Sequence, residues 1–222
     1  MVIDRAAQGR GARAGCGAAA CEYLDGQGKP AFAEACRKIL DIGCGKGGAL
    51  LEANLPPGAF VVGADMNLDE LKTCRLKLPA VHVVCASGEH LPFRTEVFDA
   101  YLARSAWPYM NLVKGSEEAY RVLSPEGSLW VTARNPAYAF AAWLRSVRLR
   151  WAHGVVFNGY VLLNGLLFHL TGRIFRFPFK WWGMSRYESF QTRRSLLGLL
   201  RGAGFRGIRI VRGGFFVITA VK

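Results

Sequence analysis

A short stretch near residue 40 limits the possible folds of this chain more than any other. The run from Lys38 to Gly48 reads KILDIGCGKGG, with a few apolar residues followed by four glycines and then by the apolar start of a helix. This order predicts a buried strand, a tight turn and a helix. Glycines in such a turn let backbone N–H groups approach a ligand, because no Cβ stands in the way. The stretch therefore predicts a nucleotide-binding corner in an α/β fold.

The residue at the end of this strand, Asp41, indicates which nucleotide binds. Gly43, Gly45 and Gly48 fit the GxGxxG spacing of dinucleotide-binding proteins, but the charge of Asp41 would repel a pyrophosphate. S-adenosylmethionine has no phosphate; its sulfonium and ammonium would both be attracted by a nearby carboxylate. Asp65 ends the next apolar strand and is placed to accept hydrogen bonds from ribose hydroxyls, which both nucleotides carry. We therefore favour S-adenosylmethionine over a dinucleotide, with a ligand-free glycine turn as the remaining alternative.

Further motifs extend this pattern along the chain. In order they are Asp41 to Gly47, Val61 to Met66, Ser87 to Phe93, Phe98 to Tyr101, Arg121 to Val131 and Ala203 to Phe205. Together they resemble the motifs of the class I S-adenosylmethionine-dependent methyltransferase superfamily. Their spacing is most similar to that of its small-molecule enzymes of the ubiquinone and menaquinone C-methyltransferase type. The resemblance covers residues 31–135 and 185–222.

The resemblance implies a Rossmann-like α/β fold, with a seven-stranded, mostly parallel sheet and an antiparallel last strand. Apolar strands that alternate with helices agree with such a sheet. We expect strands at 39–42, 60–64, 81–85, 98–103, 128–133, 208–211 and 215–218, and helices at 31–37, 49–53, 68–76, 116–123 and 192–200. A largely helical insertion, residues 135–188, is expected between strands five and six.

We expect residues 1–222 to form a single methyltransferase domain. Residues 1–30 have no apolar segment typical of a secretory signal, so a mobile tail is expected there, with a mitochondrial presequence as the alternative. Six cysteines without CxxC spacing indicate neither a zinc site nor a disulfide framework, and they favour a reducing, cytoplasmic compartment.

The resemblance also implies which residues hold S-adenosylmethionine. They are Asp41, Gly43, Gly45, Asp65, Met66, Ser87, Gly88, Glu89 and Arg104. Members of the family commonly have an Asp at the position of Ser87, where it meets the adenine amino group. A serine can still accept a hydrogen bond there, but it brings no charge.

Residues that bind the acceptor are expected just after the fourth strand, because ligands of such sheets lie outside the carboxyl ends of the strands. We predict that Trp107 and Tyr109 border the acceptor, with a place in the core as the alternative, and Tyr138 is a third candidate. Methyl transfer from a sulfonium mainly requires alignment and exclusion of water, so neither a metal nor a catalytic triad is predicted. Four residues are candidates for a base: His153, His169, Tyr138 and Glu188. The histidines and Glu188 also fit structural roles, so no catalytic base is assigned.

The net charge of +13 is confined to one part of the chain. Residues 134–222 hold 15 Lys and Arg and one acidic residue, Glu188, whereas residues 1–133 are nearly neutral. Within the basic part, Trp151 to Gly172 carries no charge and is followed by cations interleaved with aromatics. We interpret the insertion as a lid that faces a membrane; a soluble lid and a nucleic-acid-binding surface are the alternatives. A membrane span is disfavoured, because later strands must return to the same sheet.

These observations predict a methyltransferase that acts on a lipophilic or aromatic small molecule at a membrane surface. The expected location is cytoplasmic, peripheral on the inner membrane. An RNA methyltransferase that uses the basic half is the alternative, although nucleic acid is the less favoured partner. A non-catalytic protein of the same fold that acts as a membrane adaptor is the third.

Overall fold

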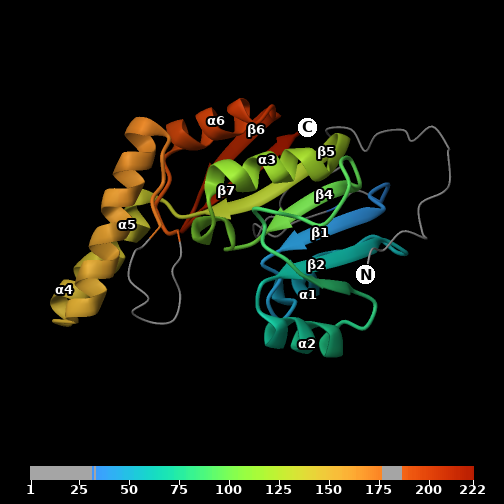
Figure 1. Ribbon diagram of the computed structural model, residues 1–222, viewed down its shortest axis with the longest axis horizontal. Coiled ribbons are helices and arrows are strands. Elements are labelled where there is room, and N and C mark those ends of the chain that lie inside the picture. Colours follow the sequence, from blue (N-terminus) through green and yellow to red (C-terminus); the bar gives the residue numbers. More distant parts are fainter. Residues whose placement is uncertain (1–31, 33, 177–186) are drawn as a thin grey trace.

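A computed structural model describes residues 32, 34–176 and 187–222 (Figure 1). Its centre is a seven-stranded sheet with the order β3-β2-β1-β4-β5-β7-β6. The strands are β1 (Lys38–Ile42), β2 (Phe60–Asp65), β3 (His82–Cys85), β4 (Phe98–Ala103), β5 (Leu123–Ala133), β6 (Arg206–Arg212) and β7 (Phe216–Val221). Strands β1 to β5 pair in parallel, and β7 runs antiparallel to both of its neighbours. The predicted sheet and its antiparallel last strand are confirmed.

Helices cover both faces of this sheet. They are α1 (Gly48–Glu52), α2 (Leu68–Lys77), α3 (Leu112–Val122), α4 (Pro136–Arg148), α5 (Ala152–Thr171) and α6 (Arg193–Gly202), with a 3₁₀ turn, η1, at Trp107–Tyr109. The alternation of side chains along β1 shows the two layers. Leu40 and Ile42 belong to the core cluster that includes α3 and α6, whereas Ile39 packs with Leu50 of α1 on the other face. Asp41 therefore shares the face of α1.

Two expected helices differ from those observed. The helix expected at 116–123 begins at Leu112, because the side chain of Asn111 accepts hydrogen bonds from the N–H groups of Val113 and Lys114 and so caps an earlier start. Leu123 already belongs to β5. The prediction of a helix at 31–37 is wrong for residues 34–37, because 34–35 form a turn and 36–37 have no regular secondary structure. Residues 31 and 33 and the expected tail at 1–30 lie outside the described residues.

The insertion contains the helical hairpin α4–α5, as expected. The two helices pack against each other and lie together at one side of the sheet, apart from α1 and α2 (Figure 1). In the described part of the chain, α5 is the one helix whose length and composition would allow it to cross a membrane. Asn164 ties α5 to the rest of the insertion: its amide donates to the carbonyls of Phe175 and Glu188, and its oxygen accepts from the N–H of Phe175.

Candidate functional site

A cavity of about 630 Å³ opens at the carboxyl ends of β1, β2 and β4. Parallel strands of this kind place the loops that follow them at one edge of the sheet, where ligands bind. Seven of the nine residues expected to hold the cofactor line this cavity: Gly43, Asp65, Met66, Ser87, Gly88, Glu89 and Arg104. Asp41 and Gly45 are absent from the lining itself.

Asp41 lies directly beneath the glycine turn, and its side chain is 1% exposed. Neither of its carboxylate oxygens has a hydrogen-bond partner among the residues that the structure describes. Burial raises the pKa of Asp41 to about 8; Arg104 lowers it and Asp65 raises it, both by smaller amounts. A buried carboxyl group without a partner is costly to the fold, so its surroundings fit a ligand that brings a positive charge or hydrogen-bond donors.

Two glycines that line the cavity, Gly43 and Gly88, lie close to neighbouring side chains. Gly43 has φ +65°, and a Cβ built there would lie 2.4 Å from the Cβ of Ala106. At Gly88 a Cβ would lie 2.8 Å from Cγ2 of Ile42 and 2.9 Å from Cε of Met110. The backbone at Gly43 and Gly88 therefore packs directly against side chains of Ala106, Ile42 and Met110, and no Cβ separates it from them.

Asp65 is held at the edge of the cavity by backbone donors. The N–H of Gly45 donates to Oδ2 over 2.9 Å, and the N–H of Asn67 donates to Oδ1 over 2.8 Å. Each carboxylate oxygen can accept a second hydrogen bond. Gly45 thus stays outside the lining but orients Asp65, which is part of it and can accept further hydrogen bonds.

The loop after β3 forms the next wall. Oγ of Ser87 accepts from the N–H of Glu89 over 3.2 Å, and Oε1 of Glu89 accepts from the N–H of Asn111 over 2.9 Å. The Ser87 hydroxyl keeps its own hydrogen for a further partner. Glu89 links this loop to the start of α3, so the wall has a fixed position.

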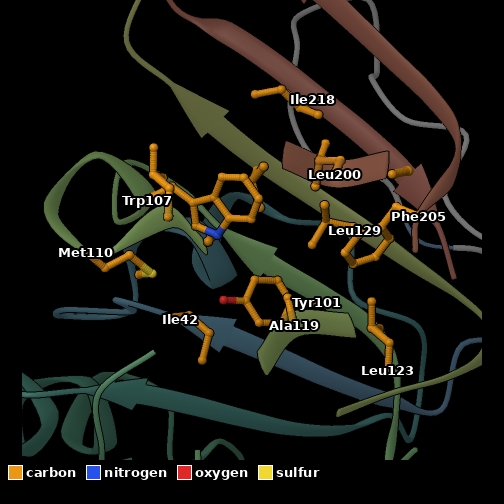
Figure 2. Packing of buried hydrophobic residues seen from close by; sticks show 14 of the residues in the cluster. Ile42, Tyr101, Trp107, Met110, Ala119, Leu123, Leu129, Leu200, Phe205 and Ile218 are labelled. Carbon is orange, nitrogen blue, oxygen red and sulfur yellow. The ribbon is translucent and has the colours of Figure 1, made fainter. Parts of the chain in front are cut away.

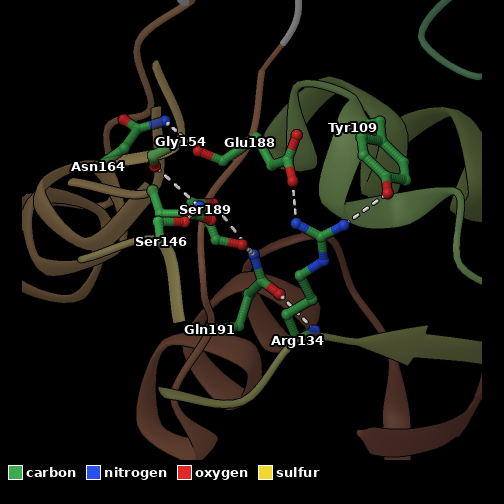
Figure 3. A network of polar contacts seen from close by, with 9 residues as sticks. Tyr109, Arg134, Ser146, Gly154, Asn164, Glu188, Ser189 and Gln191 are labelled. Carbon is green, nitrogen blue, oxygen red and sulfur yellow. Dashed lines mark hydrogen bonds and ion pairs between the residues drawn. The ribbon is translucent and has the colours of Figure 1, made fainter. Parts of the chain in front are cut away.

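Of the three predicted acceptor residues, one lines the cavity. Tyr109 does so, and its hydroxyl accepts a hydrogen bond from Arg134 (Figure 3). Trp107 does not line the cavity. Its indole is fully buried in the main core beside Tyr101, which was the alternative position considered for it (Figure 2). In the turn η1 the two aromatics point in different directions. Tyr138 is half exposed and lies outside the lining, near Phe215.

Sequence reasoning missed Arg134, which organises the polar network beside Tyr109. Its guanidinium forms an ion pair with the buried Glu188 and lies 4.9 Å from the centre of the Tyr109 ring (Figure 3). Its main chain is fixed by Gln191, whose N–H donates to the Arg134 carbonyl and whose side-chain oxygen accepts from the Arg134 N–H. The one signal was that Glu188, alone in a basic half of the chain, had to find a cationic partner.

None of the four candidate bases lines this cavity. Glu188 has a structural role, as the ion-pair partner of Arg134. His169 shares a hydrogen bond with Thr192 over 2.8 Å, and His153 is exposed at the start of α5.

Residues that were not predicted complete the cavity on the other side. Lys114 of α3, Arg176 and Tyr187 all line it, and the last two come from the insertion. From the insertion, Arg176 and Tyr187 are the described residues that line the cavity, and no lining residue comes from α4 or α5. Of the charged lining residues, Asp65 ends β2 and Glu89 follows β3, whereas Arg104 follows β4, Lys114 lies on α3 and Arg176 belongs to the insertion. The cavity therefore presents charges of both signs to a ligand.

Residues 40–131 match a family model described as a methyltransferase domain. An uncharacterized methyltransferase of Mycobacterium tuberculosis is 32% identical over 95 residues, which are 43% of this chain and 39% of that protein. The 24-methylenesterol C-methyltransferase 2 of Arabidopsis thaliana is 36% identical over 103 residues, 43% of this chain and 28% of that protein. An uncharacterized protein of Methanocaldococcus jannaschii is 33% identical over 97 residues, which are 44% of this chain and 40% of that protein. The chain thus spans two fifths or less of the length of these relatives.

Solved structures show the same fold. A SAM-dependent methyltransferase of Methanosarcina mazei superposes with a TM-score of 0.56 at 19% identity, over 83% of this chain and 92% of that one. Human N-acetylserotonin methyltransferase, in complex with SAM, superposes with a TM-score of 0.56 at 15% identity, over 85% of this chain and 48% of that one. At these identities the likeness is one of fold.

Proposed function

We propose that this chain is a class I S-adenosylmethionine-dependent methyltransferase that methylates a lipophilic or aromatic small molecule, in keeping with the methyltransferase-domain match over residues 40–131. Its cofactor is S-adenosylmethionine. The observation that carries the proposal is Asp41, a buried carboxyl group beneath the glycine turn, whose oxygens have no hydrogen-bond partner in the part of the chain described. A carboxyl group in that position fits a ligand with a cationic amino-acid part.

The residues of the cavity fit the rest of the cofactor. The backbone at Gly43 and Gly88 would face its amino-acid part and adenosine, Asp65 would accept from the ribose hydroxyls, and Ser87 and Glu89 would border the base. When bound, S-adenosylmethionine supplies a methyl group activated by the positive sulfur. What remains for the protein is to hold the acceptor in line with that methyl group and to exclude water.

The acceptor would be held by the side of the cavity formed from β4, α3 and the insertion. Tyr109 and Tyr187 offer aromatic rings to a planar acceptor, and Met110 adds apolar surface. Because Arg134 donates to the Tyr109 oxygen, the Tyr109 hydroxyl can donate its own hydrogen to an acceptor oxygen. Lys114 and Arg176 would favour an acceptor that carries negative charge near the reacting atom.

Two further observations support a lipophilic acceptor at a membrane. One relative is named as a 24-methylenesterol C-methyltransferase. The insertion that contributes Arg176 and Tyr187 to the cavity also carries the apolar helix α5. The proposed location is the cytoplasmic face of the inner membrane, where a lipophilic acceptor is concentrated.

Calorimetry and label transfer together test this function. Calorimetry should give micromolar binding of S-adenosylmethionine and no heat with NAD; binding of NAD alone would refute the choice of cofactor. The protein is then incubated with methyl-labelled S-adenosylmethionine and, separately, with a lipid extract and with total RNA. Label in the organic phase supports the proposal, whereas label in RNA favours the alternative that the basic residues 134–222 suggest. Binding without transfer to either fraction would favour the non-catalytic adaptor.

A further inference from the structure

One face of α5 is a continuous apolar stripe. Its members recur at intervals of three and four residues: Ala152, Val156, Gly159, Leu163, Leu166 and Leu170. Residues at such intervals lie on one face of a helix. The four large side chains are 53%, 59%, 49% and 68% exposed, in chain order. At 1.5 Å per residue the stripe runs for about 25–30 Å, which is long for an apolar surface left in water.

The opposite face of α5 is fixed to the protein, so the stripe cannot turn inward. Val161 and Phe168 are buried, and Asn164 is 1% exposed with its amide bonded to two backbone carbonyls. A Cβ on Gly165 would lie 2.3 Å from the ring of Phe190. This close contact and the Asn164 hydrogen bonds determine which face of the helix points outward.

Cations flank the stripe at both of its ends. Arg145 and Arg148 lie in the last turn of α4, Arg150 precedes α5, and Arg173 follows it. At the turn between the two helices Leu149 is 69% and Trp151 47% exposed. The sequence has no acidic residue from 127 to 187. An occupant of this surface must therefore combine an apolar layer with negative charges at both ends of the stripe.

We propose that the α4–α5 hairpin docks on the surface of an anionic phospholipid bilayer, with α5 in the plane of the interface. The stripe enters the boundary of the acyl chains, Trp151 lies among the headgroups, and the flanking arginines contact lipid phosphates. The helix does not span the bilayer, because its other face is bonded to the protein and the chain returns through α6 to the sheet. The proposal deepens the proposed function, on which it rests, by naming the surface from which a lipophilic acceptor reaches the cavity.

Other occupants fit these observations less well. An antiparallel pair of α5 helices from two copies would bring Arg150 of one copy close to Arg173 of the other, and no acidic residue nearby would offset the repulsion. A nucleic acid would match the arginines, but Val156 and the leucines of the stripe offer no ring on which a base could stack. A lipid surface satisfies both the charge and the aliphatic face.

Vesicle sedimentation of the full chain tests the proposal without cofactor or acceptor. The protein should sediment with phosphatidylcholine vesicles that contain phosphatidylglycerol, and much less with phosphatidylcholine alone. High salt should release only part of it, because screening weakens the phosphate contacts but not the apolar contact. Absence of binding to either vesicle would overturn the proposal.

Two double variants separate the apolar and the charged contributions. Leu163→Gln with Leu166→Gln should lower vesicle binding about thirtyfold or more, because two exposed leucines no longer enter the acyl boundary. Arg145→Gln with Arg148→Gln should lower it about tenfold and remove most of the preference for anionic lipid. Both pairs lie on exposed surface, so circular dichroism and the melting temperature should stay at wild-type values.

Helix α2 offers a matched control for each variant. Leu68 and Leu76 are 59% and 82% exposed, and Arg75 and Lys77 stand in the last turn as Arg145 and Arg148 do in α4. The corresponding glutamine substitutions in α2 should leave vesicle binding unchanged. If the α2 substitutions reduce vesicle binding as much as the hairpin variants do, binding depends on overall charge and hydrophobicity and not on the hairpin surface, and the proposal fails.

Three further measurements distinguish the remaining outcomes. A dimer in sedimentation velocity that Leu163→Gln with Leu166→Gln converts to a monomer, without vesicle binding, would assign the stripe to a second copy. RNA binding that the arginine variants abolish, again without vesicle binding, would assign it to nucleic acid. Vesicle binding in a protein that transfers no methyl group would leave the docking surface standing and refute the proposed function alone.

Discussion

Asp41 and Glu188 are buried carboxyl groups in the two halves of this chain, and their surroundings are opposite. Both are about 1–2% exposed. Asp41 has no hydrogen-bond partner among the described residues, and burial raises its pKa. Glu188 forms an ion pair with Arg134, which also contacts Tyr109. An uncompensated buried carboxyl group is a cost that a ligand can remove, whereas a compensated one stabilises the fold.

The contrast agrees with the part of the chain that the family model matches. Near Asp41, the positive φ of Gly43 and the Cβ of Ala106, 2.4 Å from where a Cβ on Gly43 would lie, leave room only for glycine. The buried Glu188 requires a cationic partner at a fixed position, which Arg134 provides. The matching family model accordingly covers residues 40–131 and ends just before Arg134.

The largest expected effect is on stability, from Glu188. Replacing it with glutamine removes the counter-ion of Arg134, whose side chain is 16% exposed. The free energy of unfolding should fall by about 2–4 kcal/mol, toward the range for breaking a buried pair. Urea denaturation measures it, and the folded variant should bind S-adenosylmethionine within a few fold of wild type. Glu126→Gln is the control: it breaks an exposed ion pair with Arg206 and should cost no more than about 0.5 kcal/mol.

The second effect is on cofactor binding, from Asp41. Asp41→Asn should weaken S-adenosylmethionine by roughly 10- to 100-fold, equivalent to about 1.5–3 kcal/mol for a hydrogen bond to a charged group. In the wild type, calorimetry near neutral pH should also detect release of protons on binding, because the ligand's positive charge favours the ionised carboxylate. Equal affinity of variant and wild type would mean that Asp41 does not face the ligand.

The third effect is the pH dependence of stability without cofactor. Asp41 has a pKa of about 8 in the fold and 3.8 as its ordinary value. Between these values the folded state keeps a proton that the unfolded state has lost, so this contribution to stability falls as the pH rises. Asp41→Asn should remove that loss and stabilise the free protein by roughly 1–3 kcal/mol above about pH 8. Denaturation at several pH values measures the slope, and a slope unchanged in the variant would contradict it.

Sequence patterns predicted those parts of the fold in which neighbouring residues along the chain determine the local structure. The alternation of Ile39, Leu40 and Ile42 and the glycines after them fix a strand and a turn wherever the sheet forms. Trp107 and Tyr109 could not be assigned this way, because only the path of η1 decides which of two neighbouring aromatics points into the core. The pairing of Arg134 with Glu188 joins residues 54 positions apart, and no local pattern signals it.

The smallest expected effect concerns Tyr109, which connects the cavity to the Arg134–Glu188 ion pair. Tyr109 lines the cavity, and its hydroxyl accepts a hydrogen bond from Arg134, the ion-pair partner of Glu188. Tyr109→Phe keeps the ring but removes one hydrogen bond to the acceptor, so kcat/KM for methyl transfer should fall roughly two- to tenfold, about 0.5–1.5 kcal/mol. The affinity for S-adenosylmethionine should not change. Tyr138→Phe is the matched control, because that ring also lies beside Arg134, at 5.6 Å, but outside the cavity lining. Equal losses in the two variants would mean that Tyr109 acts only through Arg134 and the fold, and not on the acceptor.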